Sequence, residues 1–272
     1  MARKPLILAA KPRIGSRAAA PAPRRAARGR SPALPMTKPK IPKTMSKTLA
    51  QAQTKAQTKA QTRKLTRPQS QTTDRTQAMV RKLAKTLAEA RACALCAAHL
   101  PLGPRPILRA TVTARLMIVG QAPGTRVHAS GIPWDDPSGD RLRAWLGLDR
   151  ETFYDERRIA IVPMGFCYPG RDAAGGDNKP RPECAPLWHP RLLPLMPNIS
   201  LTLLVGGYAQ ARYLGKAAKS GVAETVRGWR DFAPAFLPTP HPSWRVGLWL
   251  NRNPWFEAEI VPALRARVRA LV

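Results

Sequence analysis

The stretch that decides the fold is RLMIVGQAPG, at positions 115–124. Its run from Leu116 to Val119 is short, apolar and followed by a glycine, which is typical of a buried strand. Gly120 and Gly124 permit a tight turn and a close approach of the backbone to a ligand, and Pro123 stiffens the loop between them. On its own, such a loop after a strand most often indicates only a turn.

The alternation of short apolar runs with helical patterns continues along the chain. Three further strands are predicted, over 159–163, 201–207 and 236–240. Helices are predicted over 79–90, 139–146, 187–195, 208–214 and 253–271. Asn253 can cap the last helix, and Pro262 predicts a kink in it or its division into two. The pattern predicts an α/β fold, a three-layer sandwich with a central, mainly parallel four-stranded sheet, which binds ligands at the carboxyl ends of its strands.

The charge divides the chain into a tail and a domain. There are 46 Lys and Arg residues against 16 Asp and Glu residues, a net charge of +30, and the first acidic residue is Asp74. We therefore predict a disordered basic tail rich in Ala, Pro, Lys, Gln and Thr over 1–74, and a folded domain over 75–272. A polycation attracts nucleic acid by counterion release, without reading its sequence. A solubilising extension and an organelle transit peptide are the alternatives for the tail.

The composition excludes two classes of protein. No run of about 18 apolar residues occurs, which excludes a membrane-spanning helix. Four cysteines are too few for a secreted disulfide scaffold, and a signal-peptide core is absent. We expect a protein of the reducing cytoplasm.

All four cysteines form one pattern, in which Cys93 and Cys96 are followed after 70 residues by Cys167, and after 16 more by Cys184. Four thiolates can bind a [4Fe-4S] cluster or a tetrahedral zinc ion. The spacing does not choose between these metals, and free buried thiols are the third alternative.

Two loops carry unusual side chains. The segment GIPWDDPSGD at 131–140 places Trp134 between a proline and paired acids, and the alternative is a Trp that packs on the sheet edge. The segment TPHPS at 239–243 places His241 between two prolines, which fix the direction of its backbone. A solitary surface or core histidine is the alternative there.

Together these segments resemble the uracil-DNA glycosylase superfamily, and within it the iron–sulfur families four and five. The resemblance spans 93–272 and rests on the order of C-x2-C, a strand into G-Q-A-P-G, G-x-P-aromatic, two further cysteines, and H-P-S after the last strand. An uncharacterised bacterial group of this superfamily is the nearest match. The resemblance implies a monomeric enzyme of the bacterial cytoplasm and nucleoid. It would bind DNA and no membrane, and start base excision repair by hydrolysing the N-glycosidic bond of uracil or a related deaminated base.

The resemblance also implies a role for each matching residue. His241 would donate a hydrogen bond to O2 of the departing uracil, and Gln121 would position the attacking water. Asp136 would orient that water or stabilise the sugar cation, and Trp134 would stack on the extruded base. The other substrate-binding residues that it implies are Gly120, Ala122, Pro123, Gly124, Ser243 and Arg245. The four cysteines would be the ligands of a [4Fe-4S] cluster.

DNA contacts follow from the same resemblance. Ser243 would begin a loop that enters the minor groove, with Leu248 or Trp249 as the wedge in the vacated stack. Basic side chains would grip the phosphates, and those that suit this role are Arg126, Arg141 and Arg245. Asp140 is interpreted as a charge at the start of a helix.

Two positions depart from the family. Gln121 stands where family four has a Glu, and Pro163 stands where that family has an Asn that reads the uracil edge. Base discrimination would then fall to Asn178 or to backbone groups near Met164 and Gly165. The departure motivates a second hypothesis, a non-catalytic member of the fold that binds nucleic acid. A third is a metal-dependent nuclease or phosphohydrolase that uses Asp135, Asp136 and His241.

Overall fold

The computed structural model describes residues 73–173 and 175–272. The predicted basic tail therefore lies almost entirely outside the described residues. The described part contains one sheet of four strands, β1 (Leu116–Val119), β2 (Ile159–Ile161), β3 (Leu201–Val205) and β4 (Phe236–Thr239). Their order is β2-β1-β3-β4 and every pair is parallel. The predicted fold class is confirmed, and the sheet is parallel throughout.

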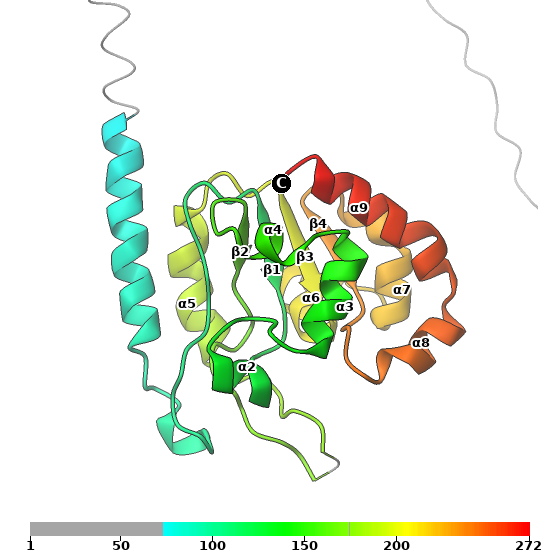
Figure 1. The fold of residues 1–272 in the computed structure, drawn as a ribbon, viewed down its shortest axis with the longest axis horizontal. Helices are drawn as coiled ribbons and strands as arrows, with labels where there is room; N and C mark the ends of the chain where they lie inside the picture. The colour runs from blue at the N-terminus through cyan, green and yellow to red at the C-terminus, as the bar shows by residue number, and fades with distance from the viewer. Residues whose placement is uncertain (1–72, 174) are drawn as a thin grey trace, which may run out of the picture. The chain divides into compact units, whose positions relative to one another are not determined.

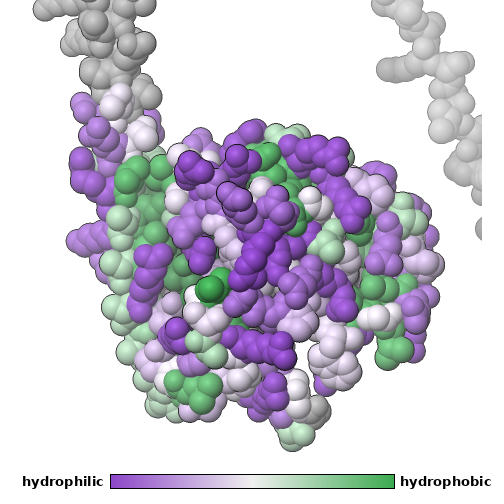
Figure 2. Space-filling model, viewed as in Figure 1, coloured by the Kyte–Doolittle hydropathy of each residue, from purple (hydrophilic) through white to green (hydrophobic). Residues whose placement is uncertain are grey.

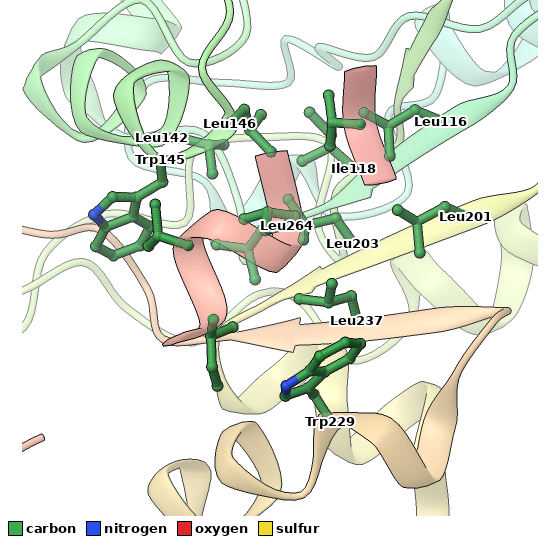
Figure 3. Close-up of a cluster of buried hydrophobic side chains, with 14 of the residues drawn as sticks. Leu116, Ile118, Leu142, Trp145, Leu146, Leu201, Leu203, Trp229, Leu237 and Leu264 are labelled. Carbon is green, nitrogen blue, oxygen red and sulfur yellow. The ribbon is translucent and has the colours of Figure 1, made fainter. Parts of the chain in front are cut away.

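The strands are buried on both faces, because helices cover both sides of a parallel sheet. On one face, Leu116 and Ile118 of β1 and Leu203 of β3 pack against Leu142 and Leu264, as Figure 3 shows. These last two residues come from α3 (Pro137–Leu146) and α9 (Val261–Arg269).

The other face is a second core. Met117 and Val119, which alternate with the residues of the first face, pack with Leu83, Leu87 and Trp188. These partners come from the helix over 73–91 and from α5 (Cys184–Leu192). Figure 1 shows the strands lying between α3 and α9 on one side and α5 on the other. The three layers are those predicted.

Most of the predicted helices are present, and several short ones were not predicted. Besides the helices above, α6 (Gly207–Leu214) follows β3 as expected. The unpredicted helices are α2 (Thr125–Ser130), α4 (Arg150–Tyr154), α7 (Val222–Arg227) and α8 (Val246–Arg252).

The C-terminal segment differs from the prediction at its start. The side chain of Asn253 does not cap the last helix: its Nδ2 donates to the carbonyl of Trp249 in α8, while its backbone carbonyl accepts from the N–H of Phe256. A π-helical segment, η5 (Phe256–Ile260), precedes α9, and Pro262 lies in the first turn of α9. The helix changes from π-helical to α-helical geometry at Val261 without a break, and Pro262 is accommodated because proline fits a first turn.

Across residues 73–173 and 175–272, every helix is too short or too polar to cross a bilayer.

Candidate functional site

The carboxyl ends of β1, β3 and β4 lie side by side and carry the loops that the sequence singled out. His241 follows β4, and Gly206 follows β3, with φ +85°. The Gly206 N–H donates to the carbonyl of Thr239, and a Cβ on Gly206 would lie 3.3 Å from the Cβ of His241. The glycine therefore allows the histidine loop to lie directly against β3.

Trp134 connects this histidine to the β1 loop. Its indole lies against Gly120, where an added Cβ would be only 2.6 Å from Cζ2 of the ring. Its ring centroid is 5.7 Å from that of His241, at an interplanar angle of 33°. Gly120, Trp134 and His241, from three separate segments, thus meet at the carboxyl edge of the sheet.

The backbone of Trp134 is held in an unusual conformation. Its φ is 60°, in the left-handed region, which is costly for a large side chain. Its carbonyl accepts a hydrogen bond from the buried Arg143, at 3.2 Å, and lies so near Gly139 that a Cβ there would clash at 1.7 Å. The Tyr154 hydroxyl donates to the carbonyl of Pro133. The surrounding contacts fix the ring, which is half-buried and also packs against the core, as the alternative interpretation expected.

Asp136 caps α3, and its second oxygen faces the β1 loop. Its Oδ1 accepts from the N–H of Gly139 at 2.8 Å, while Oδ2 lies 3.9 Å from the Cβ position of Gly124. Burial raises the pKa of this carboxyl, and the bond from Gly139 opposes that rise. Asp140, interpreted as a helix-start charge, pairs with Arg143.

A second carboxylate, Asp177, was missed by the sequence analysis. Its Oδ2 lies 3.3 Å from the same Cβ position of Gly124. Partial burial raises its pKa, Arg171 lowers it, and the nearby Asp136 raises it further. No motif marks Asp177, because only the fold brings residues 177 and 178 to the β1 loop.

Gln121 connects the β1 loop with the backbone at Asn178 by a hydrogen bond. Its Nε2 donates to the backbone carbonyl of Asn178 at 3.0 Å, and the Asn178 amide donates to the carbonyl of Pro169. Since the Gln121 nitrogen faces a carbonyl, its Oε1 is the atom left to accept a hydrogen bond. Ala122 packs near Gly165, and Pro123 is buried.

The segment after β2 offers less to a base than predicted. The N–H groups of Met164 and Gly165 donate to the carbonyls of Gly120 and Gln121, so they are occupied. The carbonyl of Pro163 accepts from Nε2 of the buried His189, whose Nδ1 faces the Tyr213 hydroxyl at 2.9 Å. Base reading by the N–H groups of Met164 and Gly165 is therefore ruled out by this geometry, which leaves the side chains of Gln121 and Asn178.

The imidazole of His241 is largely enclosed, and burial lowers its pKa to about 4. It is therefore neutral at pH 7, and it can donate one hydrogen bond. Among the described residues, neither ring nitrogen has a hydrogen-bond partner. The next two carbonyls, of Pro242 and Ser243, accept from Nη1 of Arg141 at 3.1 and 2.8 Å. Arg141, predicted as a phosphate contact, thus binds the protein backbone.

Beyond Ser243 the chain presents apolar side chains to solvent. Trp244 is 76% exposed and Leu248 is 72% exposed, and the Arg245 guanidinium lies over the Trp244 ring. Trp249 instead packs against Trp255 and Phe256, so it is not available as a wedge.

The four cysteines line a single pocket, together with residues that follow β2 and residues of α5. All are free thiols, and the rest of the lining is Arg181 and mostly apolar residues, among them Leu95, Leu100, Phe166, Leu187 and Trp188. Burial raises the pKa of Cys96, Cys167 and Cys184, that of Cys184 to about 12. Among the residues that the structure describes, no three His, Cys, Asp or Glu side chains converge closely enough to hold one metal ion.

The described residues form a parallel α/β domain with an aromatic ring and a neutral histidine at the carboxyl edge of the sheet, the edge at which such folds bind ligands. Residues 109–265 match the model of the uracil DNA glycosylase superfamily, and the chain belongs to that superfamily. The match includes Gly120, Trp134 and His241, and it begins after Cys93 and Cys96.

Proposed function

We propose that this protein is a DNA glycosylase that extrudes uracil, or a related deaminated base, and hydrolyses its N-glycosidic bond. The observation that carries the proposal is the meeting of Trp134, Gly120 and a neutral His241 at the ligand-binding edge of a superfamily member. The base inside a duplex is out of reach, so it must leave the stack and enter the site.

Trp134 and His241 bind the extruded base in this proposal. Stacking on the indole supplies about 1–3 kcal/mol per base. As the glycosidic bond breaks, its electron pair stays with the base, and the neutral imidazole donates a hydrogen bond to the negative O2. A donor of this kind lowers the barrier by about 2.7–4 kcal/mol.

Asp136, Asp177 and Gln121 act on the water. The water oxygen bonds to the anomeric carbon, and one of its protons passes to a carboxylate that faces Gly124. A raised carboxyl pKa suits this task, because a stronger base takes the proton more readily. Oε1 of Gln121, oriented by the bond to Asn178, accepts a hydrogen bond from the water or the base.

Trp244 and Leu248 contact DNA in this proposal. Both are exposed beside the histidine loop, so either can enter the stack that the base has left. Arg126 and Arg245, with the basic tail, hold the phosphates, and the enzyme acts as a monomer at the nucleoid.

The cysteine pocket fits a [4Fe-4S] cluster better than zinc. Around one zinc ion, thiolate sulfurs lie ~3.8 Å apart, as Zn–S bonds of ~2.3 Å in a tetrahedron require. The four thiols line one pocket, yet no three of the described His, Cys, Asp or Glu side chains form a group that could hold one metal ion, and in a cluster each thiolate binds a different iron atom. Bound there, a cluster would hold the segment that carries Cys93 and Cys96 against α5.

A non-catalytic DNA-binding protein is the second candidate. Pro163 and the occupied N–H groups of Met164 and Gly165 favour it, because they remove a means of reading uracil. A metal-dependent nuclease is less well supported, since Asp135 pairs with Arg150 and lies in no convergent set of metal ligands among the described residues.

The test uses labelled oligonucleotides that contain one uracil, hypoxanthine or mismatched thymine, followed by alkaline cleavage of abasic sites. A shorter strand with uracil, lost in His241→Ala while DNA binding survives, supports the glycosylase. Tight binding without cleavage of any of these substrates would instead support the non-catalytic candidate.

A further inference from the structure

The segment that carries His241 is held on both sides of the histidine by hydrogen bonds from other elements. Residues 240–245 form neither helix nor strand, and Pro240 and Pro242 contribute no backbone N–H. On the strand side, the end of β4 is fixed, because the carbonyl of Thr239 accepts from the Gly206 N–H and from the buried Gln210 amide. On the C-terminal side of His241, a residue of another element holds the backbone by hydrogen bonds.

That residue is Arg141 of α3. Its Nη1 donates to the carbonyls of both Pro242 and Ser243, the two residues that directly follow the histidine. The carbonyl of Ser243 also accepts from the N–H of Val246, which leads into α8. Resting on the proposed glycosylase function, we propose that Arg141 is the positioning residue of His241, which sets the direction in which the imidazole donates its hydrogen bond.

Helix α3 is suited to this task because it also fixes the other side of the base pocket. Asp136 caps it, Gly139 lies under the carbonyl of Trp134, and Arg143 donates to that carbonyl. Its apolar face, with Leu142 and Leu146, is fully buried against the sheet. Contacts with α3 therefore position both the Trp134 ring and the His241 imidazole, although the two residues lie more than 100 positions apart in the sequence.

The chemistry of arginine fits this geometry. Each terminal nitrogen of a guanidinium carries two N–H groups in the plane of the group, so Nη1 can donate to two neighbouring carbonyls. A lysine ammonium keeps the charge as a point on a flexible stem, without this fixed planar geometry. This difference separates a positioning role from the phosphate contact that the sequence alone predicted for Arg141.

Single-turnover excision of uracil and the salt dependence of DNA binding are the two measurements, on Arg141→Lys and Arg141→Met. We expect both variants to excise about 100-fold more slowly, since a small misplacement of a catalytic group costs that much. The slope of log affinity against log salt should be that of the wild type. The double variant R141M/H241A should be no slower than H241A, because Arg141 acts through the histidine.

Arg265→Met is the matched control. Arg265 donates to the carbonyl of Ala144 on the same helix, at 2.8 Å, but on the side of α9. Its loss removes a comparable arginine–backbone bond without touching the histidine loop, so excision should stay within about twofold of wild type.

Two results would overturn the inference. A phosphate contact would make the salt slope of R141M shallower by about one unit, leave that of R141K unchanged, and spare the rate at saturating DNA. Losses that multiply in R141M/H241A would show that Arg141 acts independently of His241.

A readout without substrate keeps this test apart from the proposed function. In NMR titrations, assigned with H241A, the wild-type His241 signal should titrate near its lowered pKa of about 4. Loosening of the loop in R141M exposes the ring and shifts this pKa towards the ordinary value near ~6.5, and R265M leaves it in place. An inactive wild-type enzyme would refute the glycosylase, whereas an unshifted His241 in R141M would refute the role of Arg141.

Discussion

Gly120 lies directly against the Trp134 ring, and its missing side chain has a measurable consequence. In Gly120→Ala the new Cβ would lie 2.6 Å from the Trp134 ring, so the indole must move. We expect single-turnover excision to fall about 100-fold, as for other small displacements in active sites. Gly221→Ala is the control, because a Cβ there meets open space. Equal excision rates in G120A and wild type would show that the position of the indole is unimportant.

The raised pKa of the Asp136 carboxyl predicts how the rate of excision falls at acid pH. Burial raises its pKa above the ordinary value near ~3.9, and only the ionised form can accept a proton from water. Excision should therefore decline with falling pH before an exposed aspartate would titrate. Asp136→Asn keeps a capping side chain and should give a low rate that is independent of pH.

Asp149→Asn is the control for this profile. Asp149 caps α4 through the N–H of Thr152, and its pKa is lowered chiefly by that bond. The variant should keep the wild-type acid limb. An unchanged limb in D136N would assign the titration to another group.

His241 links stability to pH with the same sign as a salt-bridged acid, because in both cases the folded pKa lies below the unfolded one. Its folded pKa of about 4 lies below the unfolded value near ~6.5, so protonation favours the unfolded chain. Its stabilising contribution is present above ~6.5 and is lost as the pH falls towards 4. Between pH 7 and pH 5 this loss should be at most about 2 kcal/mol. Urea unfolding should show a smaller difference between these pH values in His241→Gln, and an equal difference would contradict the burial of the ring.

Among the helices and strands, those with a clear pattern of apolar residues in the sequence were predictable. The four strands and helices α3, α5 and α6 follow from apolar runs, because burial on both faces of a parallel sheet demands them. Short helices such as α4 and α8 escaped, since one or two turns carry too few residues to show a period. The topology also brought Gly120 and His241 together, because parallel strands end at the same edge. Asp177 and the role of Arg141 were beyond prediction, since their partners lie more than 50 residues away and no spacing encodes them.

The four cysteines share one prediction. They are Cys93 and Cys96 before β1, Cys167 after β2, and Cys184 at the start of α5. Purified protein should be brown, with broad absorbance near ~400 nm and iron and sulfide in equal amounts, as a [4Fe-4S] cluster requires. Cys184→Ala should lose this absorbance and lower the thermal stability, because it removes one of the four proposed ligands of the cluster. One zinc per chain and no iron would refute the cluster.

At the scale of the molecule, positive charge is concentrated at one end of the sequence. Residues 1–73 hold 18 basic residues and no acidic one, whereas 74–272 hold 28 basic and 16 acidic residues. Figure 2 shows hydrophilic side chains over most of one face of the described domain, with small, separated hydrophobic areas between them. Residues 1–73 therefore carry 18 of the 30 net positive charges, while every proposed site residue lies in 74–272.

Deletion of 1–73 should separate the contribution of this charge from that of the site residues. Each phosphate neutralised adds about 0.9 to the slope of log affinity against log salt, so the deleted protein should bind DNA more weakly and with a flatter slope. Excision at saturating DNA should be unchanged, because every proposed site residue lies beyond the deletion. A chain in which 1–73 are scrambled is the control: counterion release depends on charge and not on order, so it should bind like the wild type. Equal slopes with and without the tail would show that the charge of 1–73 does not contact DNA. Loss of affinity on scrambling would mean instead that the tail is read as a specific sequence.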